Sequence, residues 1–309
     1  MEVLLAIRSS CPTLYNTPTG VLNIVIDYMR CNILMIEENS LGTYDMLSQR
    51  YTSQSIDTDL KLDVIGAYLI SGRIYVLQPH HEGSVIGLSM DITGGDVKSH
   101  DVVIKRIQMG IVLFDECLYF VGGLIGNSRA LPSRQCERYD PRSKKLTTRG
   151  LLDSTRYSDP SFVSHGRTIP AKPIISAVHE RMIYVFGGSG NFTGTGEVYS
   201  PSKNTWKSIP TPFSAIPSAA VTVKDNIFIF SESDYRIHCY KPDTGIWTIH
   251  NTRCILPGLR YVHYNDGMMY LIGNEDQKEI PDFDGNNHAT CRVETPTTFP
   301  LGSHIVTQE

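Results

Sequence analysis

Several common sequence features are missing from this chain, and each absence narrows what the protein can be. The seven cysteines are odd in number and never occur in Cys-x-x-Cys spacing, which argues against a disulfide scaffold or zinc site and favours a reducing compartment. No apolar run approaches the roughly 20 residues of a membrane-spanning helix. The start, MEVLLAIRSS, lacks the regions of a secretion signal. A cytoplasmic protein without a membrane anchor is expected.

Charge and periodicity exclude further classes. The formal net charge is -4 over 309 residues, so the chain as a whole offers no positive field for nucleic acid or an anionic membrane. Hydrophobic residues make up 41% and charged residues 19%, which is enough apolar material for a core that needs no disulfide or metal. No segment shows helical spacing of apolar residues over a useful length. We therefore expect a globular chain built from strands.

A short frame recurs along the chain and determines the expected fold. A tyrosine is followed seven residues later by a tryptophan at Tyr199 and Trp206 and at Tyr240 and Trp247. Related or weaker copies are Tyr15 with Leu22, Tyr44 with Tyr51, Met90 with Val97, Tyr139 with Leu146 and Phe283 with Thr290. Ahead of the copies lie short β-rich runs at 3–7, 33–36, 74–77, 118–121, 183–186, 227–230 and 269–272. Such runs, repeated at roughly 40 to 50 residues, predict the four-stranded blades of a β-propeller.

Two further motifs give the repeat a family resemblance. Two of the runs end in a double glycine, at Gly122-Gly123 and Gly187-Gly188, and Tyr139-Asp140-Pro141 supplies a turn between strands. Together with the tryptophans, these motifs resemble the kelch repeat, and the resemblance covers nearly the whole chain. It implies an all-β fold, a kelch-type β-propeller of six or seven four-stranded blades that forms a single domain over residues 1–309.

The chain ends and one long connection complete the expected architecture. By the same resemblance, the ring is closed by pairing the N-terminal strand at 3–7 with the C-terminal strand at 302–307, which removes an exposed sheet edge. The connection at 147–173 is longer than the repeat needs. Within it, residues 156–169 (RYSDPSFVSHGRTI) predict an extra pair of strands, as an insertion or as a decayed half-repeat.

The glycine-rich stretch at 183–206 poses a choice between a phosphate loop and a turn between strands. A phosphate loop needs its glycines to lead into a helix whose N-terminal amides hold the phosphate. Gly188-Ser189-Gly190 begins like the phosphate-loop pattern Gly-x-Gly-x-x-Gly, but Thr193 stands at the position of the third glycine. The next segment reads as a strand and not as a helix. We therefore interpret the glycines as residues that let the backbone turn at positive φ.

The sequence predicts no metal, no cofactor and no catalytic residues. His80-His81-Glu82 is the one histidine cluster, but adjacent side chains of an extended chain point in opposite directions, which favours a polar loop. The segment that starts at Asp282 begins like a calcium loop, yet its sixth and twelfth positions are Asn287 and Val293, where glycine and a bidentate glutamate are required. No nucleophile elbow occurs. Cys136 is expected in the core.

A partner-binding face is implied by the resemblance to the propeller of Kelch-like (BTB–kelch) adaptor proteins, where loops after the inner strand and before the next blade bind the partner. Arg106 falls where that family often places an arginine that pairs with partner carboxylates. Carried over by position, the candidate partner-binding residues are His80, His81, Arg106, Asn127, Arg129, Arg156, Lys172, Ser189, Asn191, Phe192, Ser233, Tyr235, Arg260 and Glu275.

The predicted function follows from that resemblance. We expect a non-enzymatic protein–protein interaction module that recognises a partner protein or peptide on its loop face. It would act as the substrate-recognition part of a cullin ubiquitin-ligase adaptor or as a competitor for one, since the chain starts at the first propeller strand. Two alternatives stay open, namely binding of actin or another cytoskeletal protein, and an enzyme that acts on a sugar or small molecule in the central pocket.

Overall fold

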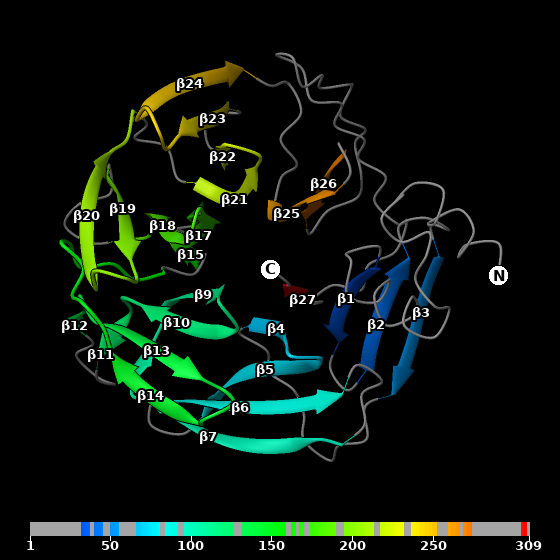
Figure 1. Ribbon diagram of the computed structural model, residues 1–309. Helices are drawn as coiled ribbons and strands as arrows, with labels where there is room; N and C mark the ends of the chain where they lie inside the picture. Colours follow the sequence, from blue (N-terminus) through cyan, green and yellow to red (C-terminus); the bar gives the residue numbers. More distant parts are fainter. Residues whose placement is uncertain are drawn as a thin grey trace, which may run out of the picture. The chain divides into compact units, whose positions relative to one another are not determined.

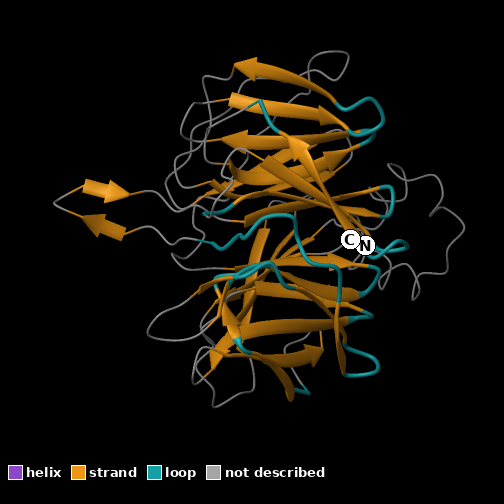
Figure 2. Ribbon diagram, turned by 90° about the vertical axis from the view of Figure 1, so that its left-hand side faces the viewer, coloured by secondary structure: helices purple, strands orange, loops and turns teal. Residues whose placement is uncertain are grey.

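The computed structural model of the protein describes residues 32–37, 40–45, 50–55, 66–80, 84–91, 96–125, 131–158, 162–164, 167–169, 174–189, 195–212, 217–231, 236–251, 259–265, 268–273 and 304–307. Within these ranges every regular element is a β-strand (Figure 2). Accordingly, the described residues contain no helix that is long and apolar enough to cross a membrane. The expected all-β class is confirmed.

The chain divides into two compact units by its internal contacts. One unit comprises Met1–Leu77, Leu88–Ser99 and Thr298–Gln308, and the other comprises Gln78–Gly87, His100–Thr297 and Glu309. An eight-stranded sheet contains the strands of the first unit (Figure 1). Its strand order is β3 (Arg50–Ser55), β2 (Ser40–Asp45), β1 (Asn32–Glu37), β27 (His304–Thr307), β4 (Gly66–Ile70), β5 (Arg73–His80), β6 (Ser84–Asp91) and β7 (Lys98–Ile104).

The C-terminal strand β27 is paired on both sides. It runs antiparallel to β1, with His304 opposite Ile36, and parallel to β4, with Val306 opposite Ala67. The C-terminal strand therefore has no free edge. Its predicted partner at 3–7 lies outside the described residues, so closure of a ring by the two chain ends stays a prediction.

Three antiparallel sheets of four strands form most of the second unit (Figure 1). The first has the order β14-β13-β10-β9, formed by Gly110–Phe114 (β9), Cys117–Val121 (β10), Cys136–Asp140 (β13) and Lys145–Thr148 (β14). The second consists of Ile174–His179 (β17), Met182–Gly187 (β18), Thr195–Ser200 (β19) and Thr205–Pro210 (β20). The third consists of Pro217–Val223 (β21), Asn226–Ser231 (β22), Arg236–Lys241 (β23) and Ile246–Asn251 (β24).

Smaller sheets complete the second unit. A three-stranded sheet joins β12 (Leu131–Pro132), β11 (Leu124–Ile125) and β8 (Arg106–Ile107), and two strands, β25 (Leu259–Asn265) and β26 (Met268–Gly273), pair with each other. The long connection contains the antiparallel pair β15 (Phe162–Ser164) and β16 (Arg167–Ile169). The strand pair predicted within residues 156–169 is therefore confirmed.

The predicted β-rich runs coincide with strands wherever they are described. The runs at 33–36, 74–77, 118–121, 183–186, 227–230 and 269–272 lie in β1, β5, β10, β18, β22 and β26, whereas 3–7 lies outside the described residues. Alternation is visible in β17, where Ile175, Ala177 and His179 are buried and the residues between them are half-buried. This period of two is the pattern of a strand with one face on the core.

Apolar side chains of neighbouring sheets in the second unit share two clusters. One cluster contains Val112 and Cys136 of the β9–β14 sheet together with Val185 of β18 and other residues. The other contains Phe186 of β18 and Ile229 of β22, again from different sheets. The β17–β20 sheet therefore packs against the sheets that precede and follow it in the chain.

Candidate functional site

The recurring frame is a cross-strand pair. Tyr199 lies directly opposite Trp206, and Tyr240 lies directly opposite Trp247, across the outer hairpin of each sheet. The ring centroids are 5.0 Å apart in the first pair and 4.6 Å apart in the second. Directly opposed aromatic side chains stabilise a strand pair. The seven-residue spacing is therefore the distance along the chain that places the two residues directly opposite each other.

The turn inside each frame has a constant backbone. The fifth residue after the tyrosine has a positive φ in all three sheets: 53° at Lys144, 53° at Asn204 and 68° at Gly245. In the first sheet Asp140 Oδ1 accepts hydrogen bonds from the backbone N of Arg142 at 3.0 Å and of Ser143 at 3.3 Å. Such carboxylate-to-backbone bonds stabilise tight turns. The Tyr-Asp-Pro motif thus has a structural role.

The double glycines occupy backbone conformations that side chains disfavour. Gly122 and Gly123 have φ of 65° and 94°, and Gly187 and Gly188 have φ of 72° and 80°. A Cβ added at Gly122 would also overlap the carbonyl oxygen of Arg156. Glycine adopts positive φ at little cost and leaves room for a close approach. The interpretation of the glycines in the stretch 183–206 as turn residues is confirmed for Gly187 and Gly188.

Arg106 lies inside the second unit. Its side chain is 2% exposed, and its Nη2 donates to Glu137 Oε2 at 2.7 Å. Its Nη1 donates to the carbonyl oxygen of Gln135 at 3.0 Å and to that of Gly122. A guanidinium whose donors are used this way holds the inner and third strands of the β9–β14 sheet together. The structure therefore revises the expectation that Arg106 faces a partner.

Arg156 repeats this arrangement in the next sheet. Its side chain is 1% exposed, and Nε donates to Glu197 Oε1 at 3.0 Å. Nη1 donates to the carbonyl oxygen of Gly187 at 2.7 Å, and Nη2 donates to the backbone and hydroxyl oxygens of Thr195 at 2.5 and 3.0 Å. Burial and the engagement of all three guanidinium nitrogens take Arg156 out of the predicted partner-binding face as well.

The two arginines share a pattern that sequence reasoning missed. Each donates to the carbonyl of the first glycine in a double glycine and to a glutamate two residues before the frame tyrosine, Glu137 or Glu197. The glutamates are visible in the sequence as ERYD and EVYS. That shared offset marks the two glutamates as equivalent positions of the repeat, although it does not reveal their arginine partners.

A strap, residues 150–157, starts after the β9–β14 sheet and runs along the β17–β20 sheet. At its beginning, Trp206 Nε1 donates to the carbonyl oxygen of Gly150 at 2.9 Å, and the N of Gly150 donates to Asn204 Oδ1 at 2.8 Å. At its end, Tyr157 and Ser189 exchange two backbone hydrogen bonds of 3.1 and 2.8 Å. The strap therefore spans from the outer turn of this sheet to the end of its inner strand.

The middle of the strap is fixed by carboxylates. Asp153 Oδ2 accepts from the backbone N of Ser208 at 3.0 Å and from its hydroxyl at 2.9 Å. The N of Asp153 in turn donates to Glu197 Oε2 at 2.7 Å. Glu197 thus binds two parts of the strap, the backbone of Asp153 and the guanidinium of Arg156. Part of the oversized connection is therefore an integral element of the β17–β20 sheet.

The other predicted contact residues differ in what the structure describes. Ser189 is 8% exposed and lies two residues after the end of β18. His80 ends β5 and Arg260 lies in β25, but their side chains are not described. The remaining candidates lie outside the described residues: His81, Asn127, Arg129, Lys172, Asn191, Phe192, Ser233, Tyr235 and Glu275.

Comparison with known families identifies one part of this geometry. Residues 176–212 match the family model described as Kelch motif. The chain carries a kelch repeat. None of the curated proteins compared with the chain matched it. The matched kelch repeat spans β17 to β20, so one repeat corresponds to one four-stranded sheet. The kelch repeat, the strand-only structure of the described residues and the several four-stranded antiparallel sheets fit a kelch-repeat β-propeller.

The kelch repeat also sets the general class of function. A kelch repeat supports a β-propeller that acts as a protein-interaction module in general. In this repeat the tyrosine, the tryptophan, both glycines and the Arg156–Glu197 pair are all engaged inside the chain. These signature residues therefore build the scaffold of this sheet.

Cys136 lies in the core, as the sequence predicts, because its side chain is fully buried in a cluster shared by two sheets. This burial raises the pKa of the Cys136 thiol from its ordinary value of 9.0 to about 12. We expect Cys136 to resist alkylation by iodoacetamide at pH 8 in the native protein and to react fully in 8 M urea, as read by peptide mass spectrometry. Rapid labelling of the native protein would contradict the burial.

Burial of Cys136 also affects stability at high pH. The thiol of the unfolded chain ionises at a lower pH than the buried thiol of the folded chain. Cys136 should therefore lower the free energy of unfolding as pH rises from 9.0 towards 12.

Proposed function

We propose that the chain is a non-enzymatic kelch propeller, a single domain of six or seven blades that recognises a protein or peptide partner on its loop face. The observation that carries the proposal is the kelch repeat at 176–212, whose signature side chains are engaged within the sheet. A scaffold of this kind leaves the segments between strands, such as residues 190–194 between β18 and β19, to provide the specific contacts.

The finer assignment rests on the resemblance to Kelch-like adaptor proteins. That resemblance supports a role as the substrate-recognition part of a cullin ubiquitin-ligase adaptor or as a competitor for one, and binding of actin or another cytoskeletal protein is the second candidate. The scattered cysteines favour a place in the cytoplasm. With Arg106 and Arg156 buried, Asn191 and Phe192 become the first residues of this face to test, since an aromatic ring and an amide are suitable partner contacts.

The test is affinity purification of the chain from cells, with quantitative identification of bound proteins. The double variant N191A/F192A is expected to lose at least about 10-fold in the recovery of the specific partner, since loss of an anchor at an interface costs about 1–2 kcal/mol or more. Lys203→Ala is the matched control. Lys203 is exposed in the turn at the other end of β19, and its substitution should leave recovery unchanged.

The outcome separates the candidate functions. Cullin or adaptor subunits among the proteins lost with N191A/F192A support the ubiquitin-ligase assignment, and actin among them supports the cytoskeletal one. A chain that recovers no protein, but turns over a sugar or another small molecule, favours the propeller enzyme. Equal recovery by the double variant and Lys203→Ala contradicts the proposed face.

A further inference from the structure

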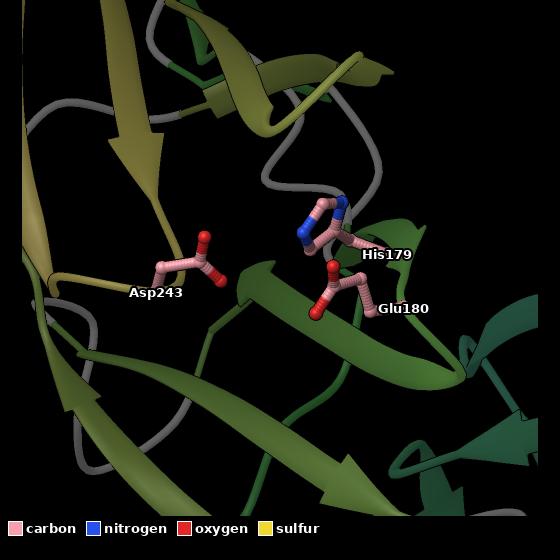
Figure 3. A group of neighbouring side chains, drawn as sticks. All are labelled: His179, Glu180 and Asp243. Carbon is pink, nitrogen blue, oxygen red and sulfur yellow. The ribbon is translucent and has the colours of Figure 1, made fainter.

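Three ionisable side chains from two neighbouring sheets converge in the second unit (Figure 3). His179 is the last residue of β17, Glu180 follows it in the β17–β18 turn, and Asp243 lies in the β23–β24 turn. One ligand atom from each side chain, a ring nitrogen or a carboxylate oxygen, lies within 4.8 Å of the other two. In Figure 3 a ring nitrogen of His179 faces the two carboxylates. These atom types in this arrangement are those of a metal site.

His179 provides an independent indication that something binds there. The residue is 7% exposed, and its Nε2 is buried without a hydrogen-bond partner. Buried polar groups in native proteins are paired in the large majority of cases, because leaving one unpaired costs free energy. A bound ion with a vacant coordination position would take up the lone pair of Nε2. The unpartnered imidazole therefore points to a ligand.

The charge around His179 favours a cation. Among the ion pairs of the described residues none includes Glu180 or Asp243. The negative charges of Glu180 and Asp243 also act on the interior of the sheet. The pKa of Tyr184 is raised to about 12, mainly by burial and then by Tyr240, Glu180 and Asp243. Two carboxylates without a paired cation repel each other and attract a positive ion.

The two turns are held in place by contacts between their sheets. Thr222 Oγ1 of β21 donates to the carbonyl oxygen of Val178 of β17 at 2.7 Å, one residue before His179. Trp247 Nε1 of β24 donates to the carbonyl oxygen of Pro210 of β20 at 3.1 Å. The backbones that carry the three side chains are therefore fixed relative to each other before any ion binds, which lowers the entropy cost of binding.

We propose that His179, Glu180 and Asp243 bind a divalent transition-metal ion, with Zn²⁺ as the representative ion, and that this ion links the β17–β18 turn to the β23–β24 turn. Bonds of about 2.0–2.2 Å place two ligands of a tetrahedral ion about 3.4 Å apart. Because the ligand atoms lie within 4.8 Å of one another, the exposed carboxylates of Glu180 and Asp243 need to close by at most about 1.4 Å, which side-chain rotation allows. One imidazole and two carboxylates suit Zn²⁺ better than soft ions that prefer thiolates. The fourth position is left to water.

The site is tested on the full chain, freed of metal by a chelator, with Zn²⁺ alone as the probe. Isothermal titration calorimetry should find one Zn²⁺ per chain with this ligand set, and Tm should rise as free Zn²⁺ is increased, because the ion binds only the folded state. Glu180→Gln and Asp243→Asn should each weaken binding by at least about 10-fold and abolish the rise in Tm. Both side chains are exposed, so the variants are expected to fold.

Asp225→Asn is the matched control, because Asp225 is an exposed acid in the β21–β22 turn outside the cluster. It should bind Zn²⁺ as the parent chain does. Substitution with Co²⁺ provides a second measurement, since a site of nitrogen and oxygen ligands gives ligand-field bands without a thiolate charge-transfer band. Binding that is unchanged in Glu180→Gln and Asp243→Asn would overturn the proposal, as would a thiolate band or the absence of any Zn²⁺-dependent rise in Tm.

Discussion

Glu197→Ala is expected to lower the free energy of unfolding by about 3–5 kcal/mol, the usual cost of removing one partner of a buried ion pair. Glu197 is 0% exposed and accepts from Arg156 Nε at 3.0 Å and from the N of Asp153 at 2.7 Å. Without the carboxylate, a buried guanidinium loses its counter-charge and two donors lose their acceptor. Urea unfolding followed by tryptophan fluorescence measures the loss, since Trp206 lies in the same sheet.

Two further variants bracket this result. Glu137 pairs with Arg106 in the same way, but its side chain is 21% exposed, so Glu137→Ala should cost clearly less than Glu197→Ala. Asp225 is exposed in a turn, and Asp225→Ala should change stability by no more than about 0.5 kcal/mol. If Glu197→Ala is as mild as Asp225→Ala, the buried pair does not stabilise the β17–β20 sheet.

Gly122→Ala is expected to cost about 2–5 kcal/mol from two separate causes. Gly122 has a φ of 65°, which costs a residue with a Cβ about 1–2 kcal/mol. The new methyl group would also overlap the carbonyl oxygen of Arg156 in the strap, and overpacking of this kind typically costs about 1–3 kcal/mol. Thermal and urea unfolding of the variant provide the measurement.

Gly245→Ala separates these two causes. Gly245 has a φ of 68°, but an added Cβ would meet no atom within 4 Å. This variant should therefore show the conformational cost of about 1–2 kcal/mol alone. The difference between the two variants isolates the steric cost at the strap. Equal losses at Gly122 and Gly245 would show that the strap retreats from the methyl group freely.

The strands and their pairing were predictable because their signals are local. Alternating apolar residues mark each strand, and the seven-residue frame fixes which residues meet across the outer hairpin, as Tyr199 meets Trp206. Positive φ at the double glycines was predictable from their place directly after a strand, because glycine adopts this conformation at little cost. For the same reason, the strand pair β15–β16 was visible within a connection that has no counterpart in the repeat.

The roles of the arginines were not predictable from position alone. Arg156 and Glu197 are 41 residues apart in the chain, and nothing local to either residue shows that the two are paired. The position of Arg156 in the repeat suggested a loop that faces solvent. Its side chain is instead buried, because it forms hydrogen bonds inside the sheet. The meeting of His179 with Asp243 depends in the same way on how two sheets pack, which residue order does not reveal.

The strap also has a consequence for the order in which the protein is made. Arg156 leaves the ribosome 41 residues ahead of Glu197, a delay of about 2–8 s at typical rates of synthesis. Trp206, which donates to Gly150, follows 56 residues after it. Until Glu197 has emerged, the guanidinium of Arg156 lacks its carboxylate partner, so this part of the chain cannot reach its native burial step by step. Emergence of β19 and β20 should therefore fix the strap and its sheet in one late event.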